Sequence, residues 1–256
     1  MSLFPLLLVC RTKDYDGRRA NETLPFNTTL NKVEHSFKKV PLTFAQDGLI
    51  RNGTQFMMRS SATSGFLAVD VGSSQNGVRD SCKLSTAACR QGPSGRNVFG
   101  IKKVDKVDIF GADDIVRFGQ KVRIEANPHL YKKTLVLGST THHPSCHAEL
   151  SHNQEASMHT QETFNMVWIV DSMDPNDRFE RQGEPVPAGE ALLLRHAQTG
   201  QYLATDPKKS FKNDFGTEFE VSAHSFHGIN KTQNLHLEKT GHATADVPAR
   251  FQGIEN

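Results

Sequence analysis

Short apolar segments, separated by clusters of glycine, proline and polar residues, recur along most of the chain. Within several of them apolar and polar residues alternate, as where Val122 and Ile124 flank Arg123. Such alternation is typical of a strand with one buried face. No stretch has a convincing amphipathic helical spacing, and the pattern therefore predicts an all-β protein.

The apolar segments form three copies of one larger unit. Each copy opens with valine or isoleucine, two further residues, a glycine and an apolar strand, at residues 50–58, 116–124 and 186–194. A second short strand follows after a tight turn, which predicts a hairpin. Each copy closes with an asparagine and another apolar strand, beginning at Asn97, Asn165 and Asn234. A period of roughly 68 residues is too long for a solenoid unit and suits one lobe of a closed body.

Three hairpins with three closing strands predict a β-trefoil-like (MIR-like) closed body of three pseudo-repeats with loop insertions. A single lobe could not bury its apolar face, whereas three lobes around one axis share a core. We expect that core to contain Phe56, Phe99, Val122, Trp168, Leu192, Leu194 and Leu237, with the only tryptophan at its centre.

The repeats divide the chain into an arm, a body and a tail. Residues 1–39 are predicted to form a largely irregular N-terminal arm, and residues 241–256 a C-terminal tail. The body, residues 40–240, divides into lobes at about 40–110, 111–180 and 181–240. Insertions at residues 71–95, 139–164 and 207–215 lie between the second and last strands of the lobes. We expect them to run over the surface.

Composition is that of a globular protein with enough apolar residues for one sizeable core: 256 residues, 36% of them hydrophobic. The net charge of +2 demands no nucleic acid and is compatible with an acidic partner such as tubulin. No apolar run approaches the roughly 20 residues of a membrane-spanning helix, so no membrane partner is expected. Four irregularly spaced cysteines, Cys10, Cys82, Cys89 and Cys146, are interpreted as cytosolic thiols.

The N-terminus carries a short apolar run, residues 3–10, that resembles the core of a signal peptide. It lacks a basic flank and a clear cleavage site, and we interpret it as a poorly ordered start or a misplaced start codon. Asn-x-Ser/Thr tripeptides would suit secretion but often arise by chance. They begin at Asn21, Asn27, Asn52 and Asn230.

Histidines gather at residues 142–147, followed by His152 and His159, with Cys146 among them. Imidazole and thiolate groups at short spacing can bind zinc or copper. The stretch has no HExxH motif and no second paired cysteine, and we interpret it as a polar loop. The acidic residues 171–177 lack the glycine and the terminal glutamate of an EF-hand loop. Without nucleophile, P-loop or dinucleotide motifs, we predict no enzyme and no catalytic, cofactor-binding or metal-binding residues.

Lysine pairs are scattered along the chain, and two of them lie in or near hairpins of different lobes. These are Lys132 with Lys133, and Lys208 with Lys209, the latter close to Lys212. Such pairs are commonly solvated hairpin tips. The alternative is a shared basic face that binds a partner.

Residues 93–99 read Pro-Ser-Gly-Arg-Asn-Val-Phe, a P-x-G-R-N-x-F motif. In this motif, and in order and spacing along residues 40–237, the chain resembles the cilia- and flagella-associated protein 161 family. Residues 1–31 depart from that family, which begins with a longer Gly- and Asn-containing segment and a charged helix. Arg96 and Asn97 of the motif join the lysines as candidate partner-binding residues.

The resemblance implies a non-catalytic microtubule inner protein in the lumen of ciliary doublet microtubules, in the A-tubule, that stabilises the doublet and supports motility. Its partners would be the α/β-tubulin lattice and neighbouring microtubule inner proteins, with no cofactor. Two alternatives remain open. One is a MIR-like module of the secretory pathway that recognises sugar or mannosylated clients, suggested by residues 194–203. The other is a metal-dependent enzyme built on the histidine loop.

Overall fold

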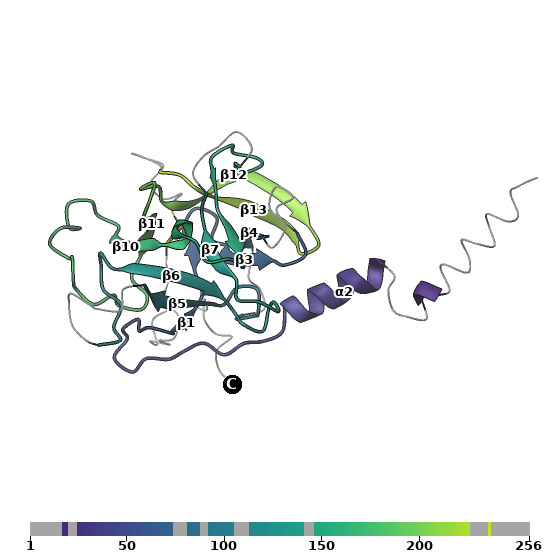
Figure 1. Ribbon diagram of the computed structural model, residues 1–256, viewed down its shortest axis with the longest axis horizontal. Helices are drawn as coiled ribbons and strands as arrows, with labels where there is room; N and C mark the ends of the chain where they lie inside the picture. The colour runs from purple at the N-terminus through teal and green to yellow at the C-terminus, as the bar shows by residue number, and fades with distance from the viewer. Residues whose placement is uncertain are drawn as a thin grey trace, which may run out of the picture.

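The computed structural model describes residues 17–19, 25–73, 81–87, 92–104, 113–140, 146–225 and 235–236. Strands dominate these residues and build one body, from which the helix α2 (Pro25–Ser36) projects (Figure 1). The predicted all-β, β-trefoil-like architecture is confirmed. Among the described residues, no helix combines the length and the apolar character needed to span a membrane.

A barrel of short strands forms the centre of the body. Its strands are β1 (Gln55–Phe56), β2 (Arg59–Ser60), β5 (Phe99–Lys103), β6 (Lys121–Ala126), β10 (Trp168–Ser172), β11 (Leu192–His196) and β14 (Leu235–His236). Their pairing order is β1–β5–β6–β10–β11–β14–β2. Because β1 and β2 follow each other along one chain segment, this order returns to its start and the sheet closes.

Three hairpins add to the barrel, one from each lobe. They are built from β3 (Phe66–Asp70) with β4 (Ser81–Ala87), from β7 (Val136–Gly138) with β9 (Ser157–His159), and from β12 (Leu203–Asn213) with β13 (Gly216–Ala223). The hairpins also pair with one another, since β4 pairs with both β9 and β13. The short strand β8 (Gln154–Glu155) joins β13 as well. Each lobe is thereby held by the other two.

The first two predicted insertions contain parts of these hairpins. Strand β4 lies within 71–95, and β8 and β9 lie within 139–164, and most of their residues are buried. The expectation that these insertions run over the surface is therefore wrong for these strands. Strand β4 is the second strand of the first hairpin, and β9 is the second strand of the second hairpin. The outer part of β12, within 207–215, is exposed or half-buried as expected.

Three residues at equivalent positions of the repeats meet around the pseudo-threefold axis. The backbone N–H of Ile50 donates to the carbonyl of Val186 (3.0 Å), that of Val116 donates to Ile50 (2.8 Å), and that of Val186 donates to Val116 (2.9 Å). All three side chains are buried. We call these three residues the closure ring, because their hydrogen bonds form a cycle through all three lobes.

The repeat glycines make the turns that follow the closure ring. Gly53, Gly119 and Gly189 all have positive φ angles, of 84°, 82° and 100°. In the first lobe the N–H of Thr54 donates to the carbonyl of Arg51 (3.0 Å), which closes a turn with Gly53 at its third position. A turn of this kind needs a positive φ there, and glycine adopts it without steric cost.

The predicted core is confirmed where the structure describes it. Phe56, Phe99, Val122, Trp168, Leu192 and Leu194 are all buried. The indole Nε1 of Trp168 donates to the carbonyl of Leu137 (3.0 Å), so this tryptophan buries its ring without losing a hydrogen bond. Some predicted features lie outside the described residues: Leu237, Cys10, Cys89, Asn21, Asn230, His142, His143 and the tail 241–256.

Helix α2 lies within the predicted N-terminal arm and corrects the expectation that no stretch of the chain has a convincing amphipathic helical spacing. Pro25 occupies its first position, where proline is favoured. Phe26, Leu30 and Val33 follow at helical spacing and lie on one face. The pattern is hard to recognise in the sequence because threonine and asparagine, both weak helix formers, fill much of the rest.

We predict that the buried His196 makes stability depend on pH. Its Nε2–H donates to the carbonyl of Asn165 (3.0 Å), so Nδ1 accepts from Thr199 Oγ1 (2.9 Å) in the neutral ring. Burial lowers the pKa of His196, against the opposing effect of the Asn165 carbonyl. The folded state therefore favours the neutral ring. Its contribution to stability is complete above the ordinary histidine pKa of about 6.5 and is lost as pH falls through the lowered folded pKa.

Urea unfolding measured from neutral pH to about pH 5 tests this. The free energy of unfolding should fall on acidification in the parent chain, and fall less steeply in His196→Gln. The exposed His129→Gln serves as the control and should keep the parent slope. Equal slopes for the parent and His196→Gln would contradict the assignment.

Candidate functional site

The P-x-G-R-N-x-F segment holds the inner end of helix α2 against the body. The N–H of Gly95 donates to the carbonyl of Lys38 (2.9 Å), and the N–H of Arg96 donates to the carbonyl of Ser36 (3.1 Å). Lys39 and Ser94 form an antiparallel bridge between the two segments. The motif therefore fixes where α2 ends and in which direction it leaves the body.

Arg96 is 3% exposed and forms a bidentate ion pair with Glu218 of strand β13. Its two terminal nitrogens donate to the two carboxylate oxygens at 2.7 and 3.2 Å, and its Nε donates to the carbonyl of Val69 (3.3 Å). Ser85 and Asn213 also donate to the Glu218 carboxylate, at 2.6 and 2.7 Å. A buried ion pair is tolerated when its remaining hydrogen-bonding capacity is satisfied in this way.

Aromatic rings enclose the Arg96 guanidinium. Its central carbon lies 3.7 Å from the ring centroid of Phe215 and 5.9 Å from that of Phe37. The two rings themselves meet edge to face, with centroids 5.7 Å apart. We call Arg96, Glu218, Phe37 and Phe215 the Arg96 cluster. It joins three parts of the chain: the residue after α2, the P-x-G-R-N-x-F segment and the β12–β13 hairpin.

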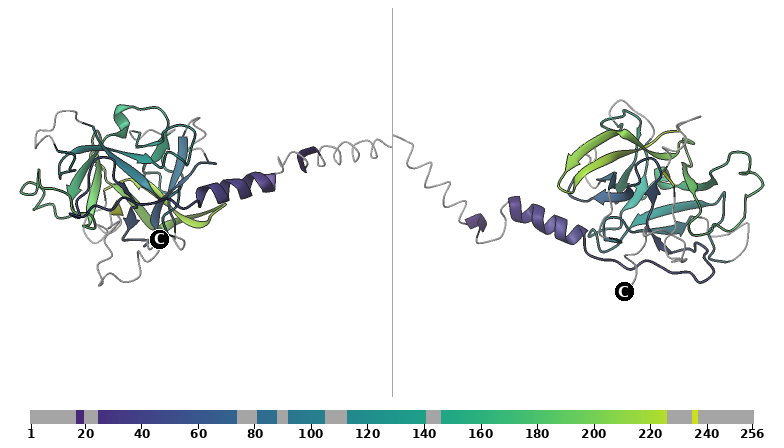
Figure 2. Two further views of the ribbon diagram at one scale, coloured as in Figure 1. Left: turned by 90° about the horizontal axis from the view of Figure 1, so that it is seen from below. Right: turned by 180° about the vertical axis from the view of Figure 1, so that it is seen from behind.

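Lys32 adds a second attachment of α2 to the body. Its ammonium group lies 2.7 Å from Asp70 and 2.8 Å from Asp214. Burial opposes the charge on Lys32, but the hydrogen bonds to Asp214 and Asp70 outweigh that effect and raise its pKa. The helix is therefore held near its inner end, while Phe26 and Leu30 on its outer part are 74% and 44% exposed. Figure 2 shows α2 pointing away from the body in both further views.

Arg96 and Asn97 cannot serve as the partner-binding surface residues that the sequence analysis expected. Arg96 is enclosed by its cluster. Asn97 is 5% exposed, accepts from the N–H of Ser94 (2.7 Å) and donates to the carbonyl of Gly92 (3.2 Å). Both side chains are buried and hold the motif in its conformation, so their role is structural.

The candidate lysines lie on two separate elements. Lys132 and Lys133 are exposed on the connection between β6 and β7, whereas Lys208, Lys209 and Lys212 lie on β12 and are exposed or half-buried. A basic face shared by both groups stays a prediction.

The histidine loop is only partly described. The Nδ1 atoms of His147 and His152 lie 3.4 Å apart, and the two ring centroids are 4.9 Å apart. His159 belongs to β9 instead, where Ser157 shares a hydrogen bond of 2.8 Å with its ring. Within the described part of the chain, no group of three or more histidine, cysteine, aspartate or glutamate side chains is placed to hold a metal ion.

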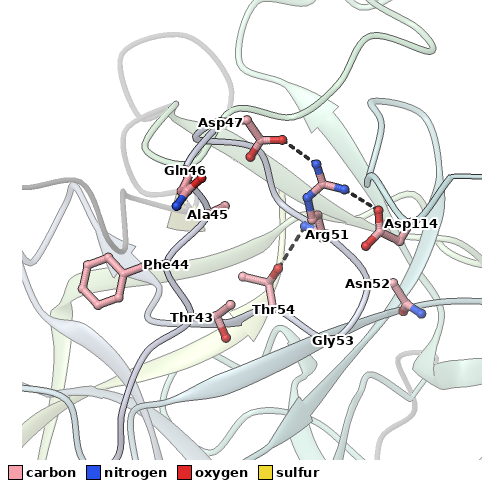
Figure 3. A pocket seen from close by; sticks show the side chains of 10 residues that line it. All are labelled: Thr43, Phe44, Ala45, Gln46, Asp47, Arg51, Asn52, Gly53, Thr54 and Asp114. Carbon is pink, nitrogen blue, oxygen red and sulfur yellow. Dashed lines mark hydrogen bonds and ion pairs between the residues drawn. The ribbon is translucent and has the colours of Figure 1, made fainter.

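A shallow pocket of about 520 Å³ lies beside the turn that follows Ile50 (Figure 3). We call it the Phe44 pocket, after the 55% exposed phenylalanine on its rim. Arg51 spans it, with its guanidinium 2.5 Å from both Asp47 and Asp114. The hydrogen bond from Arg51 lowers the pKa of Asp47, so the carboxylate is firmly ionised at neutral pH.

The sequence of this chain is similar to a known protein family. The sequence model of the cilia- and flagella-associated protein 161-like domain matches residues 62–236. Cilia- and flagella-associated protein 161 of Danio rerio is 26% identical over 226 residues, which cover 80% of this chain and 73% of the relative. The Bos taurus protein of that name is 25% identical over 253 residues, covering 92% and 78%.

Solved structures match the fold at low sequence identity. The SDF2-like protein from Arabidopsis thaliana has a TM-score of 0.56 at 17% identity and covers 74% of this chain and 93% of its own. The Saccharomyces cerevisiae protein O-mannosyltransferase Pmt1–Pmt2 complex has a TM-score of 0.57 at 18% identity, with 79% and 26% covered. At such identities these likenesses convey the fold alone.

We predict that Arg96→Ala destabilises the protein by about 3–5 kcal/mol, because it leaves the Glu218 carboxylate buried without its counter-ion. Arg96→Lys should have an intermediate destabilising effect, since it keeps the charge but loses the bidentate geometry. Lys102→Ala is the control, because the Lys102 side chain, which pairs with Glu125 at 2.8 Å, is 57% exposed. That change should cost less than about 1 kcal/mol. Urea unfolding measures all three, and equal costs for Arg96→Ala and Lys102→Ala would contradict the Arg96 cluster.

Proposed function

This chain belongs to the cilia- and flagella-associated protein 161 family, and from that membership we propose that it is a microtubule inner protein. It is a cilium- and flagellum-associated protein. The proposal adds that it binds the lumenal wall of axonemal doublet microtubules, in the A-tubule, stabilises the doublet and supports beating. Its partners would be the α/β-tubulin lattice and neighbouring inner proteins.

The rigid attachment of α2 is the structural observation that supports this proposal most. The Arg96 cluster and Lys32 fix the helix to a closed body, so α2 presents Phe26 and Leu30 in a defined direction. A preorganised protein loses little conformational entropy when it docks. These features suit a protein that acts by shape rather than by catalysing a reaction.

In a repeating lattice, weak contacts are sufficient to keep a protein bound. Doublet microtubules present the same tubulin surface at regular intervals, so each copy of the protein can also be held by its neighbours. A second contact then forms at a high effective concentration, and the assembly persists although each contact alone is weak. We therefore expect isolated protein to bind free tubulin poorly.

Fractionation of cilia that carry an epitope-tagged full-length chain tests the proposal. The protein should remain with axonemes through detergent and moderate salt. The tag should resist added protease in intact doublets and be cleaved once the doublets are dissociated. A dynein-arm protein on the outer surface serves as the control and should be cleaved in both samples.

Three outcomes would contradict the proposal. Release by detergent alone would exclude a lattice-bound protein. Cleavage of the tag in intact doublets would place the protein outside the lumen. Detergent release together with an endoglycosidase-sensitive mass would favour the secretory-pathway alternative.

A further inference from the structure

A tight loop, residues 148–153, brings the rings of two histidines together. The N–H of Ala148 donates to the carbonyl of Asn153 (2.9 Å), and the N–H of His152 donates to the carbonyl of Ala148 (3.1 Å). His147 lies directly before this loop. The Nδ1 atoms of His147 and His152 are 3.4 Å apart, and their ring planes meet at 72°. We call these two residues the His147–His152 pair.

Strand β13 holds the tip of this loop in place. The carboxylate of Glu220, which is 9% exposed, accepts from the N–H groups of Leu150 (2.7 Å) and Ser151 (2.8 Å). The next residue, His152, has a φ angle of 57°, in the left-handed region where histidine is found more often than most residues other than glycine. Hydrogen bonds before and at His152 therefore fix the backbone that carries its ring, and the pair is preorganised.

We propose that the His147–His152 pair binds a zinc ion through its two Nδ1 atoms. Imidazole nitrogen is a common zinc ligand, and two such nitrogens at about 2.0–2.1 Å from the ion and at the tetrahedral angle are about 3.3–3.4 Å apart. The observed separation of 3.4 Å agrees with this value. Adjacent nitrogens of a tetragonal copper(II) site, at similar bond lengths, would be about 2.8–3.0 Å apart. The spacing therefore fits the tetrahedral site of zinc better.

One proton must move before zinc can bind. The Nδ1 of His147 also lies 3.0 Å from the carbonyl of Ala148, which can only accept, so without a metal ion this nitrogen carries the ring proton. Transfer of that proton to Nε2 gives the other neutral tautomer and leaves Nδ1 ready to bind the ion. The carbonyl of Ala148 keeps the hydrogen bond from the N–H of His152, so no backbone group loses its only partner.

Solvent can supply both the ion and its remaining ligands. His152 is exposed and His147 is half-buried. Since no third histidine, cysteine or carboxylate joins the pair within the described residues, we expect water at the other positions of the ion. This inference revises the sequence-based expectation that the histidine loop holds no metal ligand. It rests on the loop alone and does not depend on the proposed function.

Calorimetric titration of the purified full chain with Zn²⁺, after treatment with a chelator and its removal, tests the proposal. His147→Asn and His152→Asn should each weaken zinc binding at least about tenfold, because loss of a partner outside the ligands alone typically costs about 10–100-fold in metal affinity. Asparagine suits position 152 because it also tolerates a positive φ.

His129→Asn is the matched control. It removes an exposed histidine from the connection between β6 and β7 and should leave zinc affinity unchanged. Cys146→Ser should also leave it unchanged, since the described residues place no group of three such ligands around the pair. Unchanged thermal unfolding without metal should verify that each variant folds.

Nitrogen-15 spectra of the histidine rings locate the ion. Zn²⁺ should shift the Nδ1 signals of His147 and His152, assigned from the two variants, and leave the signals of His129 in place. Absence of zinc binding, or equal affinity in the parent and in the double variant His147→Asn/His152→Asn, would overturn the proposal. Binding through Nε2, or loss of binding in Cys146→Ser, would overturn it as well.

Discussion

The three backbone hydrogen bonds of the closure ring are the constraint on which the rest of this fold depends. Each lobe supplies one donor and one acceptor, so no lobe can complete the ring alone. The ring also places Ile50, Val116 and Val186 in the core, where their N–H and C=O groups would be costly without partners. Closing the barrel and burying the core therefore depend on the same three residues. The chain must turn sharply after each of them, which the repeat glycines allow.

The placement of helix α2 follows from this closed body. The Arg96 cluster draws on the first lobe through the motif and on the third through Glu218, 122 residues away. The Glu218 carboxylate is positioned by β13, which pairs with β4 of the first lobe and β8 of the second. The direction of α2 thus depends on the complete assembly of the lobes. A helix that is mostly exposed gains little from its own packing, and it is the buried ion pair at its base that gives it a fixed place.

The repeat could be found in the sequence because its turns and barrel strands keep their spacing in all three copies. The third strand of each lobe escaped detection because it buries polar residues. In β4, Ser85 and Thr86 are buried and form hydrogen bonds with Glu218 and Thr205, so the strand lacks the apolar alternation that predicts burial. Likewise, the motif residue Arg96 looked like a surface group. Its burial depends on a partner far away in the chain, which no local pattern reveals.

We propose that this closed body lies inside doublet microtubules, with α2 held in a fixed direction. Cryo-electron microscopy of doublets from cilia that contain the protein, compared with doublets from cilia that lack it, tests this most directly. We expect a lumenal difference density with three lobes and one projecting rod of helical thickness against the A-tubule wall. A difference density on the outer surface of the doublet, or none at all, would contradict it.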